Sequence, residues 1–111
     1  MSKHAFLALT LLVSLVAGAQ SDKYTQVMQK NIDQLDSAKS IDELQSLAST
    51  FDRIGDAEKT RWLPYYYAAL AQTWVGWNPA MKDKDGNSAK INAYLAKAEA
   101  IEKNAELYAV E

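Results

Sequence analysis

Cysteine is absent from this chain of 111 residues, and its one histidine, His4, lies close to the amino terminus. Disulfide bonds and thiolate metal sites are therefore excluded. His4 falls in the targeting segment described below, so the mature chain cannot supply the usual nucleophile–base pairs. Carboxylates remain, but they fall on polar faces or at the ends of the predicted helices, where solvation and capping account for them. We predict no catalytic residue, no cofactor and no metal.

A strong excess of either charge is also lacking, since the formal net charge is −2. No block of basic residues occurs, which argues against nucleic acid and anionic membranes as main partners. The protein is therefore expected to bind neither nucleic acid nor, by charge, a membrane surface.

The chain has no apolar run of the ~20 residues that span a bilayer. Its longest run, residues 5–17, follows Lys3 and precedes Ala17-Gly18-Ala19, the small-x-small pattern of a cleavage site. We predict a signal peptide at 1–19, cleaved after Ala19, and a periplasmic or secreted mature domain at 20–111 with no stable membrane insertion. The alternative is an amino-terminal membrane anchor.

Apolar residues recur at spacings of three and four along the mature chain, as in amphipathic helices. The pattern predicts helices at about residues 22–38, 41–54, 58–76 and 88–103, with a fifth starting at 105–111. Ser40 and Glu43 form a capping box, and Gly55 suits a left-handed helix end. Pro64 either bends the third helix or lies in its first turn. Residues 78–87 are expected to form the one long loop.

The stretch WLPYYYAALAQTWVGW, residues 62–77, holds more than half of the aromatic side chains. On a helical wheel most of the large residues share one broad arc and small residues fill the remainder, so the helix is apolar nearly all round. Such a helix lies between other helices. We therefore predict a central helix whose core residues are Tyr67, Leu70 and Trp74.

Some of these aromatic residues are alternatively candidates for a partner-binding groove, because tyrosine and tryptophan are strong interface residues. Tyr65 is the first candidate, since it lies off the main aromatic arc and beside Gln72. Trp62 and Trp77, at the ends of the helix, come next. The predicted partner-binding residues are Tyr65, Trp62, Gln72 and Trp77.

Residues 83–87, DKDGN, begin like a calcium-binding loop. A twelve-residue EF-hand loop also requires glycine at its sixth position and glutamate at its twelfth. Ser88 and Tyr94 occupy those positions here. An ordinary polar turn is therefore favoured over a calcium site.

One spacing pattern recurs along the chain. Positions separated by three, one and three residues are occupied by Tyr67, Leu70, Ala71 and Trp74, and 43 residues earlier by Tyr24, Val27, Met28 and Asn31. Tyr108 follows Tyr67 by 41 residues. Helix hairpins that recur at about 40 residues indicate stacked units, each unable to bury its apolar face alone.

At these residues the chain resembles the tetratricopeptide repeat (TPR) family. The family's first helix has an aromatic-x-x-Leu-small-x-x-aromatic pattern, matched by Tyr67, Leu70, Ala71 and Trp74. Its second helix has a small residue, matched by Ala98, and ends in a pattern matched by residues 101–104, with Lys103 in place of proline. The arrangement is similar to secreted repeat proteins of Gram-negative bacteria. The resemblance implies a solenoid that binds partners on a concave face and has no catalytic activity.

We therefore expect an all-α chain in which antiparallel helix hairpins stack as a TPR-like α-solenoid, cut from a longer protein. The expected function is a non-catalytic, extracytoplasmic scaffold for a protein or peptide. The alternative is a carboxylate-dependent enzyme, or a helical protein that binds a small ligand or cation, with residues 78–87 taking part.

Overall fold

A computed structural model of the protein describes residues 22–110 and the side chains of residues 22–103. The predicted signal peptide and its cleavage site lie outside these residues. Within the described range the regular structure is helical: a helix at residues 22–37, then α2 (Ile41–Glu58), α3 (Leu63–Trp77) and α4 (Lys84–Val110). The predicted all-α class is therefore confirmed.

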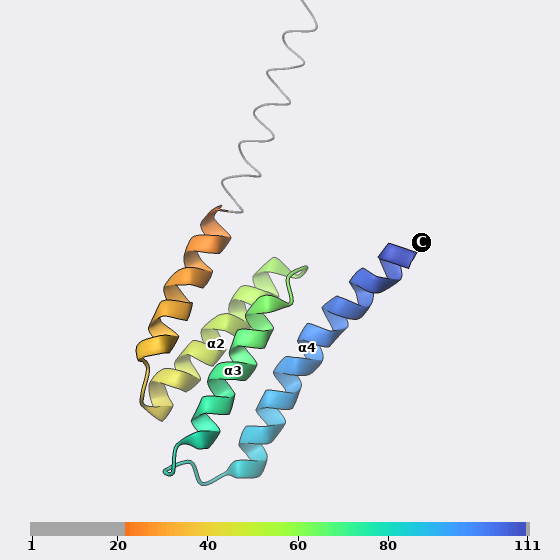
Figure 1. Cartoon of the computed structure of the whole chain (residues 1–111). Coiled ribbons are helices and arrows are strands. Elements are labelled where there is room, and N and C mark those ends of the chain that lie inside the picture. Colours follow the sequence, from red (N-terminus) through yellow and green to blue (C-terminus); the bar gives the residue numbers. More distant parts are fainter. Residues whose placement is uncertain (1–21, 111) are drawn as a thin grey trace, which may run out of the picture. The chain divides into compact units, whose positions relative to one another are not determined.

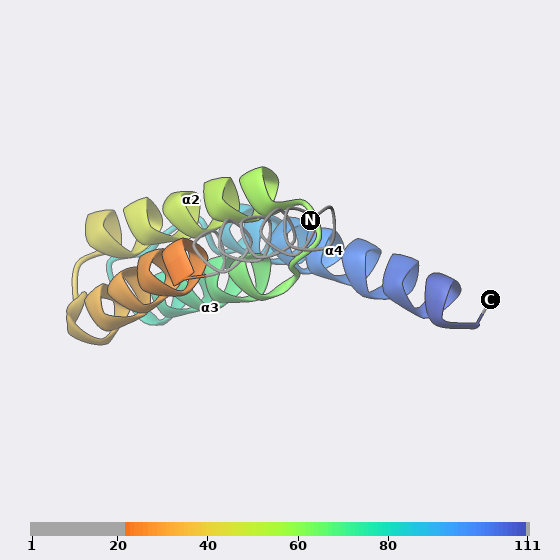
Figure 2. The ribbon, with the colours of Figure 1, turned by 90° about the horizontal axis from the view of Figure 1, so that it is seen from above.

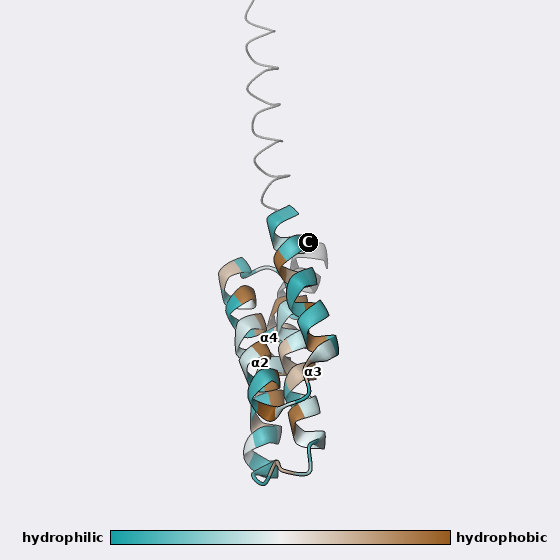
Figure 3. Ribbon diagram, turned by 90° about the vertical axis from the view of Figure 1, so that its left-hand side faces the viewer, coloured by the Kyte–Doolittle hydropathy of each residue, from teal (hydrophilic) through white to brown (hydrophobic). Residues whose placement is uncertain are grey.

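The chain forms two compact units, Met1–Lys30 and Asn31–Glu111. The first is described only at residues 22–30, which are helical. In the second unit, α2, α3 and α4 run in alternating directions (Figures 1 and 2), and α3 packs against both of the others. The predicted position of the aromatic helix between its neighbours is confirmed. Each of these helices carries both hydrophilic and hydrophobic residues along its length (Figure 3).

The start of α2 is capped by Ser40, as predicted, but Glu43 reaches the Ser40 hydroxyl rather than the Ser40 backbone N–H of a full capping box. The hydroxyl oxygen of Ser40 accepts a hydrogen bond from the Glu43 backbone N–H at 3.1 Å and donates one to the Glu43 carboxylate at 3.0 Å. This reciprocal pairing satisfies a backbone donor that has no partner within the helix.

The end of α2 differs from the prediction, because the helix continues past Gly55 to Glu58. Lys59, with φ of 65°, ends it instead, and its N–H donates to the Gly55 carbonyl at 2.9 Å. Gly55 is helical and buried. A Cβ atom there would lie 2.6 Å from Cε1 of Tyr65, so this glycine serves close packing between α2 and α3 rather than helix termination.

Pro64 lies in the first turn of α3, as the second of the two alternatives predicted. A proline there costs nothing, since the first N–H groups of a helix have no intrahelical acceptor. The single bent helix expected at 58–76 is therefore wrong: α2 and α3 are separate helices joined by residues 59–62.

The loop after α3 is shorter than expected, because α4 begins at Lys84 rather than near Ser88. The Asp83 carboxylate accepts a hydrogen bond from the Gly86 N–H at 3.0 Å, which caps the new helix. At its other end α4 continues through Asn104 to Val110. The predicted break at Asn104 and separate fifth helix are wrong, since asparagine is only mildly unfavourable within a helix.

The core of the second unit is built on the small residues of α3. Its buried positions are Pro64, Tyr65, Ala68, Ala69, Ala71, Gln72 and Val75. The expected core residues Tyr67, Leu70 and Trp74 are only half-buried, although the Tyr67 ring stacks on Phe51 of α2 with 5.4 Å between centroids. The orientation of α3 is thus turned relative to the prediction, because closely packed helices accommodate alanine more readily than a large ring.

Candidate functional site

The four predicted partner-binding residues lie on two different faces of α3. Tyr65 and Gln72 are buried, with exposed fractions of 6% and 2%, whereas Trp62 and Trp77 are 39% and 73% exposed. Tyr65, the first candidate for a partner-binding groove, is therefore a buried residue. Its ring lies against the side-chain-free backbone of Gly55, and its hydroxyl is held within the protein.

The exposed face of α3 and its N-cap carries an apolar stripe that we call the aromatic face, made of the exposed Trp62, Leu63, Tyr66 and Trp77 and the half-buried Leu70. The rings of Trp62 and Tyr66 meet edge-on with 5.7 Å between centroids. No charged residue occurs anywhere from position 62 to position 77. The stripe is therefore a solvent-exposed aromatic surface that contains no charged side chain.

On another face of α3, Tyr65 meets three charged residues, Asp52, Asp56 and Lys97, and we call these four residues the Lys97 cluster. The Tyr65 hydroxyl donates to the Asp56 carboxylate at 2.6 Å. The Lys97 ammonium of α4 lies 2.8 Å from Asp52 and 3.4 Å from Asp56 of α2, and 5.3 Å from the centre of the Tyr65 ring. The cluster links α2 to α4 across α3.

These contacts determine how the cluster titrates. The hydrogen bond from Tyr65, assisted by the Lys97 charge, lowers the pKa of Asp56. Burial, followed by the Asp56 hydrogen bond, raises the pKa of Tyr65 to about 12. The hydrogen bond with Asp52 raises the pKa of Lys97. All three groups stay in their ordinary states at neutral pH, whereas a general acid or base works best with a pKa close to the working pH.

Towards the amino-terminal end of α4 the space between α2 and α4 opens into the α2–α4 groove, about 400 Å³ in volume. Its lining is drawn from three helices: Gln45, Ser49, Gln72, Lys90, Ala93 and Tyr94. The buried amides of Gln72 and Asn87 pair beside it. Gln72 Nε2 donates to Asn87 Oδ1 at 2.6 Å, and Asn87 Nδ2 donates to the Gln72 carbonyl at 3.1 Å.

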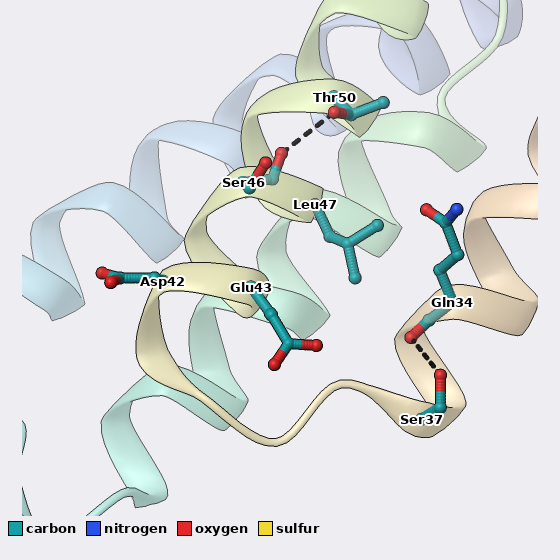
Figure 4. Close-up of a pocket in the computed structure, with 7 residues that line it drawn as sticks. All are labelled: Gln34, Ser37, Asp42, Glu43, Ser46, Leu47 and Thr50. Atoms are coloured by element: carbon teal, nitrogen blue, oxygen red, sulfur yellow. Dashed lines mark hydrogen bonds between the residues drawn. The ribbon is translucent and has the colours of Figure 1, made fainter.

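A second groove of about 560 Å³ lies between residues 34–37 and α2 (Figure 4). Its lining is mostly polar: Gln34, Ser37, Asp42, Glu43, Ser46, Leu47 and Thr50. Several of these groups are already used locally, since the Ser37 hydroxyl donates to the Gln34 carbonyl at 3.1 Å and that of Thr50 to the Ser46 carbonyl at 3.0 Å. The side chains that line this groove include no lysine or arginine.

Residues 83–87 are not a loop but a helix cap and first turn, and the Asp83 carboxylate is occupied by the Gly86 N–H. Among the described residues, no three histidine, cysteine, aspartate or glutamate side chains come together in a way that would hold a metal ion. Nor does any helix there have the length and apolar character needed to cross a membrane.

The partner-binding residues predicted from the sequence include neither Asn87 nor Lys97. Asn87 stands in a DGN triplet typical of turns, yet it is buried within α4. Lys97 pairs with carboxylates 41 and 45 residues away, and no local pattern indicates such a partner. The glycine at position 76 is the one available signal, since a Cβ atom there would lie 2.7 Å from Nδ2 of Asn87.

Comparison with known proteins finds no matching family model, no matching curated protein and no matching solved structure. A function for this chain must therefore be inferred from its own residues.

Proposed function

We propose that this chain is a non-catalytic scaffold that binds a protein or peptide, and that the aromatic face of α3 is its docking surface. One observation carries this proposal: Trp62, Tyr66 and Trp77 are 39%, 54% and 73% exposed on one side of one helix. With about 150–250 Å² for each aromatic side chain, they leave roughly 350 Å² of aromatic surface in water. Apolar patches of this size on soluble proteins are often functional.

The dimensions of the aromatic face favour a short segment as its occupant. A helix of 15 residues is about 22 Å long, so the stripe is long and narrow. A standard protein–protein interface buries about 800 Å² on each partner, more than twice the exposed aromatic area. A single helix or an extended peptide therefore fits better than a second folded copy of the chain.

The chemistry of the segment follows from the residues it would contact. Since positions 62–77 contain no charged side chain, the facing side of the partner should be apolar. A charge placed along the middle of this stripe, away from Lys84 at its carboxyl end, would lose its hydration without gaining a counter-ion. Tyrosine and tryptophan contribute strongly to such contacts because they bury large areas with few rotatable bonds.

The proposal includes a TPR-like solenoid arrangement and an extracytoplasmic location. The alternating directions of α2, α3 and α4 (Figure 1) and the short connection at 59–62 support stacked helix hairpins. Ala68 and Ala71 support close helix packing. The location is supported by the apolar run at 5–17 and the Ala17-Gly18-Ala19 pattern.

Selection from a displayed peptide library tests the proposal. The native protein serves as bait, and peptides that also bind the Tyr66→Ser/Trp77→Ser variant are removed. The selected sequences should carry apolar residues at helical or alternating spacing, and synthetic versions should bind in calorimetry. Tyr66→Ser should weaken binding roughly tenfold or more, as expected for an interface hot spot. The matched control Ser49→Ala, a residue of α2 in the lining of the α2–α4 groove, should leave the affinity unchanged.

Two further measurements identify other occupants of the same face. Sedimentation velocity detects self-association, and flotation with neutral or anionic phospholipid vesicles detects membrane binding. A dimer, or vesicle binding, that is lost in Trp77→Ser while no peptide is selected would overturn the proposal. So would peptides whose affinity is the same for the native protein and the Tyr66→Ser variant.

A further inference from the structure

The α2–α4 groove is independent of the aromatic face and lies on the other side of α3. Its volume, about 400 Å³, falls within the range of ~300–1,000 Å³ typical of small-molecule sites. Three helices of one compact unit contribute to its wall, so its shape is set by helix packing rather than by a loop.

The floor of the groove is a buried amide with an unused acceptor. Gln72 is 2% exposed, and its Nε2 donates to Asn87 Oδ1. Asn87 Nδ2 in turn donates to the Gln72 backbone carbonyl, which only an N–H group can do. The two bonds together fix the orientation of both amides, so Gln72 Oε1 points away from Asn87.

Gln72 Oε1 makes no hydrogen bond with any described residue, although no fully buried side-chain nitrogen or oxygen in that part of the chain lacks a partner. Oε1 is therefore the side-chain atom of Gln72 that remains available to a further donor. Because the remainder of Gln72 is buried, the groove that it lines is the route to this atom. A ligand with a hydroxyl or N–H donor would satisfy it.

The wall contributed by α4 adds an uncompensated positive charge. Lys90 is exposed and has no ion pair with the described residues. Asp52 and Asp56 of α2 are engaged by Lys97, two helical turns further along α4. An anionic group in the groove would therefore meet the Lys90 ammonium without competition from these two residues.

The remaining lining supplies neutral donors and a ring. Gln45 and Ser49 form the α2 wall, and Tyr94 and Ala93 form an apolar patch on α4. Burial, followed by the charge of Asp52, raises the pKa of Tyr94, so its hydroxyl stays protonated and able to donate at neutral pH.

From this arrangement we propose that the α2–α4 groove binds a small carboxylate that carries a hydroxyl or amide donor beside the acid group. The carboxylate pairs with Lys90, the donor reaches Gln72 Oε1, and the carbon skeleton lies on Tyr94 and Ala93. This chemistry occurs in sugar acids and at the carboxyl end of peptides.

Ligand-observed NMR and calorimetry on the full chain test the proposal with four probes. Glucuronate and N-acetylglycine carry both required groups, whereas glucose and N-acetylglycinamide lack the carboxylate. Either acid should bind saturably. Its neutral analogue should have an affinity lower by a factor of roughly ten or more, because a charge-assisted hydrogen bond is lost. Binding by one acid alone identifies the source of the ligand.

Variants at the rim of the groove test its location without touching the buried amides. Lys90→Met should weaken acid binding roughly tenfold or more, and Ser49→Trp should abolish it by filling the groove. Lys103→Met, another exposed lysine of α4, and Tyr66→Ser, on the aromatic face, should leave it unchanged. Thermal unfolding confirms that each variant is folded. Absence of saturable binding by both acids, or binding that Lys90→Met and Ser49→Trp leave intact, would overturn the proposal.

Discussion

Replacement of Gly55 by alanine places two opposing effects at one site. Alanine is favoured over glycine in a helix interior by about 1 kcal/mol. The added Cβ atom, however, would lie 2.6 Å from Cε1 and 2.7 Å from Cζ of Tyr65, inside van der Waals contact. Extra methyl groups forced into a packed core typically cost about 1–3 kcal/mol.

The steric effect should win because the Tyr65 ring cannot easily move aside. Its hydroxyl is held by Asp56 at 2.6 Å, and the Lys97 ammonium lies 5.3 Å from its centre. We expect Gly55→Ala to lower the free energy of unfolding by about 1 kcal/mol in the native background. In a Tyr65→Ala background the obstructing ring is absent, so the same substitution should stabilise the protein by up to about 1 kcal/mol.

Urea unfolding followed by far-ultraviolet circular dichroism measures both effects in a four-protein cycle. The coupling between the two substitutions should be about 1–3 kcal/mol, as for residues in direct contact. Tyr65→Leu replaces Tyr65→Ala if the latter does not fold. If Gly55→Ala stabilises the protein equally with and without the Tyr65 ring, the close packing of α2 on α3 described above is refuted.

Three further predictions concern titration, capping and calcium. The pKa of Tyr65 is raised from 10.0 to about 12. Its contribution to the free energy of unfolding is therefore complete below pH 10 and is lost as the pH rises through 12. Urea unfolding between pH 9 and 12 should show a fall in the free energy of unfolding that is smaller in Tyr65→Phe. Asp83→Ala removes the acceptor for the Gly86 N–H and should lower the free energy of unfolding by about 0.5–2 kcal/mol. Calorimetry of the native protein with calcium should show no micromolar binding at residues 83–87, and such binding would contradict the capping role of Asp83.

Features that depend on neighbouring residues were predictable from the sequence. The cap formed by Ser40 on the Glu43 N–H involves residues three apart, and it is present as expected. The helical periodicity likewise predicted the all-α class, and the position of Pro64 was correctly included among two alternatives. Helix ends were less predictable, because Gly55 serves a neighbouring helix and Asp83 begins α4 earlier than the loop-like DGN triplet indicates.

The rotation of α3 could not be predicted from hydropathy, because both of its faces are apolar. Size decides the matter: Ala68 and Ala71 let neighbouring helices approach, while Trp62 and Trp77 remain exposed. The pairing of Gln72 with Asn87 depends on how α3 and α4 align. Such alignment is a tertiary property that a helical wheel for one helix does not contain.

The linear order of contacts has a kinetic consequence. α3 packs on α2 and on α4, its neighbours in the sequence, so most loops that must close during folding are short. Low contact order of this kind is associated with folding on the order of microseconds to milliseconds. The Lys97–Asp52 bond, between residues 45 apart, is one of the few interactions that must wait for all three helices. We therefore expect it to form on the late, native side of the folding barrier, where an interaction slows unfolding and leaves the folding rate nearly unchanged.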